Sequence, residues 1–110
     1  MILKKHWLKM ILSRKKTMEI RGRAFKPGKY HLGCKGVVRG MAILGDAVPI
    51  PDEETWTKLR EEHCVESTQL PYKKTWGLPI VEAKSLRPVP FVHTHGAVSI
   101  VKYRAPSADE

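Results

Sequence analysis

Residues 6–23 change from a helical to an alternating pattern of apolar side chains. Residues 6–16 contain no Gly, Pro or Asp, and their apolar side chains recur at helical spacing, Trp7, Leu8, Ile11 and Leu12. From residue 17 the pattern alternates, with Met18 and Ile20 on one face and polar side chains on the other, Thr17, Glu19, Arg21 and Arg23. These two periods predict an amphipathic helix over residues 6–16 and a strand over residues 17–23.

Residues 27–50 have the apolar, glycine-containing character of β-structure. Pro27-Gly28 is a turn signal, and residues 30–34 follow it as a short strand. Residues 36–50 combine Val, Met, Ile and Leu with interspersed Gly, a composition typical of a strongly bent strand. We therefore expect two strands here, the second of them bent.

A second helix is expected to begin after Pro51. Asp52 can accept a hydrogen bond from the first helical turn, and the two acids that follow it lie where the helix dipole favours negative charge. Three residues at helical spacing mark the side that we expect to be buried, Trp56, Leu59 and His63. The helix start therefore accounts for much of the acidic character in the middle of the chain.

The remaining chain is predicted to contain a polar loop and two further strands. Residues 65–75 are polar and loop-like. Residues 77–92 contain several prolines, which cannot donate to a strand ladder, so we expect any strand there to be short or at an edge. Residues 97–104 are rich in Val and Ile and predict a final strand, and residues 105–110 predict a disordered tail.

Two helices and five or six short strands favour an α+β fold, a small and partly open barrel with helices at its rim. The chain of 110 residues has the length of one domain, which we place at residues 1–104. A domain of this size can bury a single modest core.

Positive charge is concentrated in the first third of the chain. The net charge is +9, from 20 Lys or Arg and 11 Asp or Glu. Residues 1–40 hold 12 of the basic residues and a single acid, Glu19, whereas residues 41–75 carry a net charge of −3. This excess favours a phosphate-rich partner such as a nucleic acid over a small metabolite, although some basic domains are charged only for solubility.

The sequence also predicts a cellular compartment. Two cysteines, Cys34 and Cys64, are too few for a secreted domain held together by disulfides. We find no secretory signal and no apolar run long enough for a transmembrane helix, so we expect an intracellular protein, cytoplasmic or nuclear, with no membrane contact. The basic, acid-free residues 1–18 leave a mitochondrial presequence as an alternative.

No metal or cofactor is expected. His93 and His95 form one pair of possible ligands and His63 and Cys64 another, but neither has further ligands at a familiar spacing.

Two motifs resemble those of the ASCH domain, a family of PUA-like β-barrels. Lys16, Thr17, Glu19 and Arg21 match the family's KTxExR pattern, without the Gly that often precedes the Lys. The second match is Tyr72-Lys73-Lys74-Thr75-Trp76-Gly77-Leu78 followed by Leu86-Arg87-Pro88-Val89-Pro90-Phe91. It is similar to the family's Trp-containing strand and its later run of prolines and an aromatic residue. The resemblance spans about residues 3–104.

The resemblance implies a small PUA-like mixed β-barrel of about five or six strands, with two or more short helices and a cleft beside the first helix. ASCH domains are generally thought to bind RNA or DNA through this cleft, so RNA or another single-stranded nucleic acid is the expected partner. Some members are enzymes, either amidohydrolases acting on N4-acetylcytidine or ribonucleases. Catalysis would then fall to Lys16, Thr17 and Glu19. The acetylcytidine hydrolases carry a second Thr where this chain has Glu19, which weakens that alternative.

The residues of the first motif have chemistry that suits a nucleotide. Same-face positions on a strand are about 7 Å apart, so Thr17, Glu19 and Arg21 would project together. Lys16, at the corner between helix and strand, would reach the same space. Two neighbouring cations would keep Glu19 ionised to accept from a base amino group, while Lys16 and Arg21 pair with phosphate. Alternatively, Glu19 and Arg21 form only an ion pair that fixes the strand.

Further contacts to nucleic acid are expected from aromatic and basic side chains outside that motif. Tyr72 and Trp76 flank two lysines, of which Lys73 is a candidate contact, and such rings stack on bases. Trp76 could equally belong to the core. Three further cations are candidates for phosphate contacts, Arg23, Lys35 and Arg39. Alternatively, they form a solvated face. A protein-interaction module that uses the acidic second helix, residues 52–66, is the remaining alternative.

Overall fold

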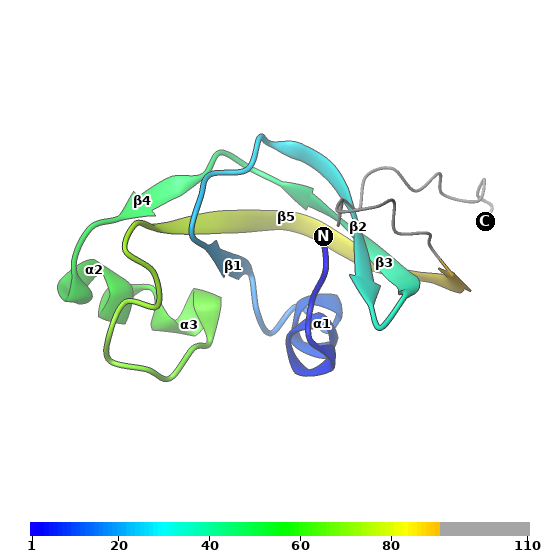
Figure 1. Ribbon diagram of the computed structural model, residues 1–110, viewed down its shortest axis with the longest axis horizontal. Coiled ribbons are helices and arrows are strands. Elements are labelled where there is room, and N and C mark those ends of the chain that lie inside the picture. Colours follow the sequence, from blue (N-terminus) through cyan, green and yellow to red (C-terminus); the bar gives the residue numbers. More distant parts are fainter. Residues whose placement is uncertain (91–110) are drawn as a thin grey trace.

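The computed structural model describes residues 1–90 (Figure 1). The predicted strand at 97–104, the tail at 105–110 and the pair His93 and His95 lie outside these residues. The described elements follow one another in the order α1 (Lys5–Leu12), β1 (Met18–Arg21), β2 (Gly28–Cys34), β3 (Val37–Leu44), β4 (Val48–Ile50), α2 (Glu53–Lys58), α3 (Arg60–His63) and β5 (Thr75–Pro90). The predicted α+β class is thereby confirmed.

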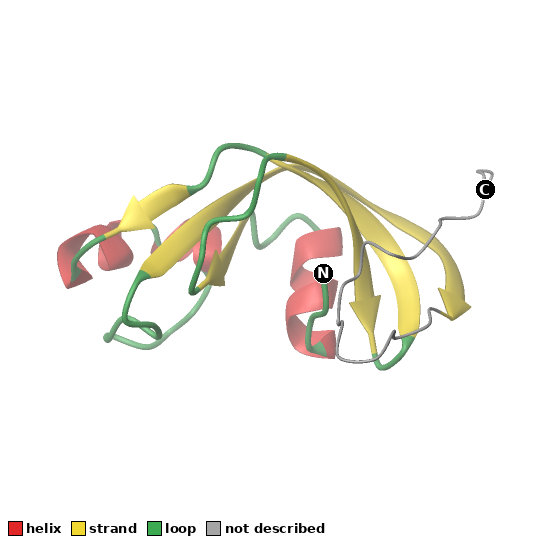
Figure 2. Cartoon of the chain, turned by 45° about the horizontal axis from the view of Figure 1, so that its top comes forward, coloured by secondary structure: helices red, strands yellow, loops and turns green. Residues whose placement is uncertain are grey.

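The five strands form one antiparallel sheet with β5 at its centre. The order along the sheet is β1-β5-β3-β2, and β4 pairs with the first residues of β5. Figure 2 shows these strands arching over α1, so the sheet is strongly curved. The described strands do not close into a complete barrel, which agrees with the partly open form that we predicted. The parallel component of the described sheet is a single bridge between Ile2 and Gly33.

The prediction of a short or edge strand over residues 77–92 is wrong, because β5 is 16 residues long and central. Two of its three prolines, Pro79 and Pro88, lie where the ladder is interrupted, and the third, Pro90, is the last residue of the strand and lies opposite Val37. β4 and β3 pair with the same edge of β5, one after the other. The pairing with β4 ends at Gly77 and the pairing with β3 begins at Ile80, so Pro79 lies between the two. Pro88 lies in the irregularity between the Gly40–Ser85 and Val38–Val89 pairs. A missing N–H therefore costs little at either position.

The first helix ends earlier than predicted, at Leu12 rather than at residue 16. Arg14 takes a left-handed conformation with φ 68°, and its guanidinium donates to the carbonyl oxygen of Ile80 at 3.0 Å. This reversal turns the chain back toward the sheet, so that Lys16 points into the molecule instead of lying on a last helical turn.

Two other elements are divided where the sequence predicted continuity. The bent strand expected over residues 36–50 is interrupted at residues 45–47 and forms β3 and β4. The second helix begins as predicted, with the Asp52 carboxylate accepting from the Thr55 N–H at 2.8 Å, but it breaks at Leu59 into α2 and α3. No helix within residues 1–90 combines the length and apolar character that crossing a bilayer requires.

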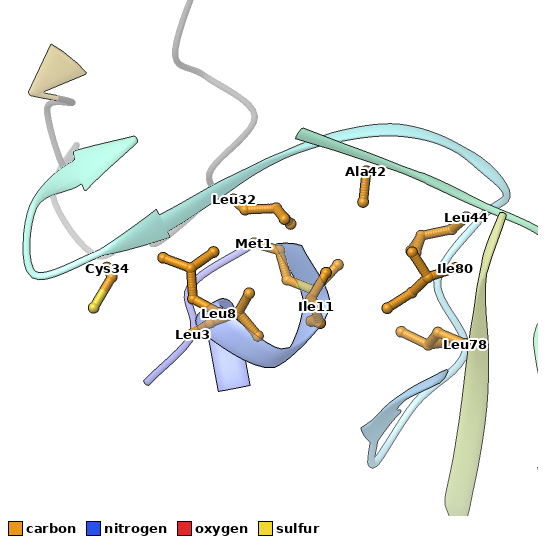
Figure 3. Packing of buried hydrophobic residues seen from close by; sticks show 10 residues of the cluster. All are labelled: Met1, Leu3, Leu8, Ile11, Leu32, Cys34, Ala42, Leu44, Leu78 and Ile80. Atoms are coloured by element: carbon orange, nitrogen blue, oxygen red, sulfur yellow. The ribbon is translucent and has the colours of Figure 1, made fainter. Parts of the chain in front are cut away.

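The buried apolar side chains form two clusters, one on either side of β1. In the first cluster, Leu8 and Ile11 of α1 pack beneath the curved sheet (Figure 3), against Leu32, Ala42, Leu44, Leu78 and Ile80. The second cluster joins β1 to β4 and α2 and contains Met18, Ile20, Ile50 and Trp56. The second cluster therefore covers the face of β1 that carries Met18 and Ile20, and the one carboxylate on the other face, Glu19, is only 6% exposed.

Candidate nucleic-acid interface

Three charged side chains meet at β1. Arg21 Nε donates to Glu19 Oε2 at 2.7 Å, and Lys16 Nζ lies 3.8 Å from Glu19 Oε1. The side chains of Lys16 and Glu19 are 1% and 8% exposed, whereas that of Arg21 is 26% exposed. The alternation of β1 places Glu19 and Arg21 on one face, as the sequence predicted, and the reversal at Arg14 brings Lys16 to them. We call these three residues the charged cluster.

Lys16 is held on several sides. Its Nζ donates to the carbonyl oxygen of His63 and lies 4.6 Å from the centroid of the Trp7 ring. Burial lowers the pKa of Lys16, the charges of Glu19 and Cys64 oppose this effect, and the charge of Arg21 adds to it. A buried ammonium of this kind is stable only while its carboxylate partner is present.

His63 fixes the carbonyl that holds Lys16. Its fully buried ring stacks on Trp56 with a centroid distance of 3.9 Å. Nδ1 accepts from the Val65 N–H at 2.9 Å, so Nε2 carries the proton and donates to the Trp56 carbonyl oxygen, also at 2.9 Å. Both ring nitrogens are therefore satisfied in the neutral form, and protonation of Nδ1 would break the bond to Val65.

Acidification is expected to destabilise the fold through His63. Burial lowers its pKa below the usual 6.5, so the unfolded chain takes up a proton at a higher pH than the folded chain does. The contribution of His63 to the free energy of unfolding is fully present above pH 6.5. As the pH falls below 6.5 this contribution decreases, by at most about 1.4 kcal/mol per pH unit. Denaturant unfolding at a series of pH values between about 7.5 and 5.5 measures this loss.

His31 contributes with the same sign, because burial lowers its pKa as well. NMR titration of the individual imidazole rings separates the two groups. A His63 ring that titrates at or above pH 6.5 in the folded protein would contradict the expected loss.

The charged cluster lies at the floor of a cleft of about 330 Å³. One wall comes from the N-terminal segment and α1, with Ile2, Leu3, Lys4 and Trp7. The opposite side comes from Ile20 and from the loop after α3, with Val65, Pro71 and Tyr72. Tyr72 is 45% exposed at the rim, and its ring rests on Gly22, where an added Cβ would come within 3.1 Å of Cδ1. The cleft thus combines buried charge with two aromatic rings, Trp7 and Tyr72.

The structure brings four of the predicted site residues to this cleft, Lys16, Glu19, Arg21 and Tyr72. Thr17 does not line it. The backbone of Thr17 instead joins α3 to β5. Its N–H donates to the Glu62 carbonyl oxygen at 2.9 Å, and its carbonyl oxygen accepts from the Ile80 N–H at 2.8 Å.

The other predicted site residues lie elsewhere. The Arg23 guanidinium lies 4.4 Å from the ring centroid of Phe25, Lys73 is exposed, and Trp76 is half-buried against the first cluster. Lys35 and Arg39 line a separate groove beside α1. The residues that line the cleft do not include Arg23, Lys73 or Trp76.

Sequence reasoning missed two parts of the cleft wall. Trp7 follows the apolar period of the helix and packs against the first cluster, and it also lines the cleft, while residues 65–75 were predicted only to be a polar loop. For Pro71 the sequence carries no signal, because its place depends on where α3 ends.

Comparison with known proteins identifies the fold. No family model matches the chain, and no curated protein matches it. Among solved structures, a serine-to-alanine mutant of ZmASCH from Zymomonas mobilis is similar, with a TM-score of 0.69 and 24% sequence identity. The match covers 82% of this chain and 71% of that chain. The chain therefore has an ASCH-like fold, as the two sequence motifs implied.

Proposed function

We propose that the protein binds RNA or another single-stranded nucleic acid and holds one nucleotide in the cleft. The observation that carries this proposal is the charged cluster of Lys16, Glu19 and Arg21 in a cleft that the rings of Trp7 and Tyr72 also line. The ASCH-like fold supports a function related to nucleic acid, and the concentration of cations in residues 1–40 supports a polyanionic ligand.

The charged cluster has the chemistry to recognise both parts of a nucleotide. Glu19 accepts one bond at 2.7 Å from Arg21, and a carboxylate has room for further donors, such as the exocyclic amino group of a base. Arg21 is the most exposed member of the cluster. Its Nη2 donates to the Ile2 carbonyl oxygen at 2.8 Å, and the N–H groups that remain can donate to a phosphate. Tyr72 at the rim offers a face on which a base stacks.

The size of the cleft favours one nucleotide rather than a duplex. Ligand cavities have volumes of about 300–1,000 Å³, and the 330 Å³ of this cleft lies at the lower end of that range. A single base with its sugar is therefore the largest group that we expect to enter. The rest of the strand would remain outside, where exposed Lys4 lies at the cleft wall.

The hydrolase alternative receives less support from the geometry than binding does. A nucleophilic Thr17 would have to face the ligand, but Thr17 is not among the residues that line the cleft. The lowered pKa of Lys16 is compatible with a general base, yet its Nζ is occupied by the His63 carbonyl and by Glu19.

Tyr72→Ala is expected to weaken binding of a labelled single-stranded RNA by about 5- to 150-fold, because loss of one base stack costs about 1–3 kcal/mol. Tyr72 is half exposed, so the substitution leaves the fold intact. Fluorescence anisotropy titrations of the wild type and the variant, repeated with single-stranded DNA, measure the effect.

Tyr72→Phe is the matched control, since it keeps the ring and should bind like the wild type. Salt supplies a second criterion. With four phosphate contacts, raising the salt from about 50 to 200 mM should weaken binding about 50-fold. Undetectable binding, or binding indifferent to both salt and Tyr72, would contradict the proposed function.

A further inference from the structure

A second concave surface, which we call the basic groove, lies on the side of α1 away from the cleft. It has a volume of about 440 Å³ between α1 and the hairpin of β2 and β3, which lie side by side (Figure 1). Helical residues are about 100° apart, so Lys5 and Lys9, which line the groove, lie about 160° around the helix from Trp7, which lines the cleft. One helix therefore separates two concave surfaces.

The lining of the basic groove has an unbalanced positive charge. Four exposed cations line it, Lys5 and Lys9 from α1 and Lys35 and Arg39 from the hairpin, with no carboxylate among the lining residues. Glu19, the only acid in residues 1–40, is already bound to Lys16 and Arg21 on the other side of α1. Within residues 1–90 none of the four cations forms a salt bridge. Such a cluster attracts anions.

The hairpin holds Lys35 at this position despite a local energetic cost. Cys34 and Val37 are paired across a two-residue turn in which Lys35 and Gly36 have φ values of 52° and 79°. Turns of this kind prefer Asn-Gly, because a side chain such as lysine is unfavourable at positive φ. The floor between the cations is apolar and buried, with Leu8 and Cys34 only 3% and 4% exposed.

The basic groove and the cleft meet at the start of α1. Lys4 lines the cleft and its neighbour Lys5 lines the groove. A helix is about 10–12 Å across, so a single nucleotide cannot contact both surfaces. We propose that the basic groove binds the phosphate backbone of the same nucleic-acid strand whose nucleotide enters the cleft. This inference rests on the proposed function, and it makes the ligand an oligonucleotide that bends around the N-terminal end of α1.

The test compares a short with a long ligand. The double variant Lys35→Asn and Arg39→Gln removes two cations and keeps a turn residue suited to positive φ. It should weaken binding of a single-stranded RNA of about a dozen nucleotides by about tenfold at 0.15 M salt, and reduce the salt slope by about 1.4. Binding of a mononucleotide should not change, because it occupies only the cleft.

The matched control is Lys29→Gln with Lys84→Gln, which removes two exposed cations that line neither surface and, within residues 1–90, form no salt bridge. If both double variants weaken RNA binding equally, the effect comes from the net charge of the protein and the inference is overturned. It is also overturned if neither variant weakens binding. If Tyr72→Ala weakens binding and the groove variant does not, the proposed function survives and the groove is excluded. The reverse pattern would exclude the cleft. If the groove variant loses binding to phosphatidylserine vesicles but still binds RNA like the wild type, the groove contacts a membrane surface and the inference is overturned.

Discussion

Glu19→Ala is expected to lower the free energy of unfolding by about 3–5 kcal/mol, because it leaves Lys16 buried without its carboxylate partner. Lys16 is only 1% exposed, so water cannot replace the lost charge. A loss of this size is a large part of the stability of a small domain, which is about 5–15 kcal/mol. Urea unfolding followed by circular dichroism measures it.

The double variant Glu19→Ala and Lys16→Met should recover most of that loss, since it removes both buried charges while filling the space of the lysine with an apolar chain. Binding of RNA should not return with stability, because the charged cluster is gone. Glu54→Ala provides the surface control. Glu54 pairs with Lys58 at 3.6 Å with both side chains more than 70% exposed, and its loss should change stability by well under about 1 kcal/mol. Equal effects for Glu19→Ala and Glu54→Ala would contradict the importance of the buried pair.

Trp56→Ala is expected to have a comparable effect, a loss of about 3–5 kcal/mol. The Trp56 side chain is fully buried, stacks on His63 and donates from Nε1 to the Ser67 carbonyl oxygen at 2.7 Å. Its removal opens a cavity in the second cluster and also frees the loop that carries Pro71 and Tyr72. Thermal unfolding gives the stability, and hydrogen exchange at residues 65–72 gives the mobility of the loop.

Trp56→Phe separates the two consequences. It keeps an apolar ring but lacks the N–H, so the fold should survive with a smaller loss while exchange in the loop accelerates and RNA binding weakens. Trp76→Phe is the matched control, because Trp76 lies outside the cleft and has no bond to this loop among the described contacts. The Ser67 carbonyl oxygen also accepts from Arg60 at 3.1 Å, so unchanged exchange in Trp56→Phe would show that the bond from Trp56 does not anchor the loop.

The floor of the candidate site could be predicted from the sequence, because it depends on local geometry. Alternation along β1 places Glu19 and Arg21 on one face, and both have the predicted ion-pair geometry. The tether on Lys16 could not be predicted in this way. Its acceptor, the carbonyl of His63, is 47 residues away, and only the packing of α3 against β1 brings the two together.

The misjudged strand β5 shows a different limit. Prolines normally exclude a segment from the centre of a sheet, and the sequence pattern of residues 77–92 says nothing about where neighbouring strands begin and end. Pro79 is compatible with a central strand only because β4 ends and β3 begins beside it. That information belongs to the three-strand arrangement and not to any one segment.

The central position of β5 also has a consequence for how the chain folds. The hairpin of β2 and β3 joins neighbouring residues, and hairpins of this kind form in about 1–10 μs. Within residues 1–90, β1 by contrast pairs with β5, where Ile20 lies opposite Gly77, a residue about half the chain length away. On a ribosome the hairpin can therefore form early, whereas β1 waits until residues 75–90 have been synthesised. Pairings between strands so distant in sequence slow folding. Until these pairings form, the carboxylate of Glu19 and the amine of Lys16 remain hydrated.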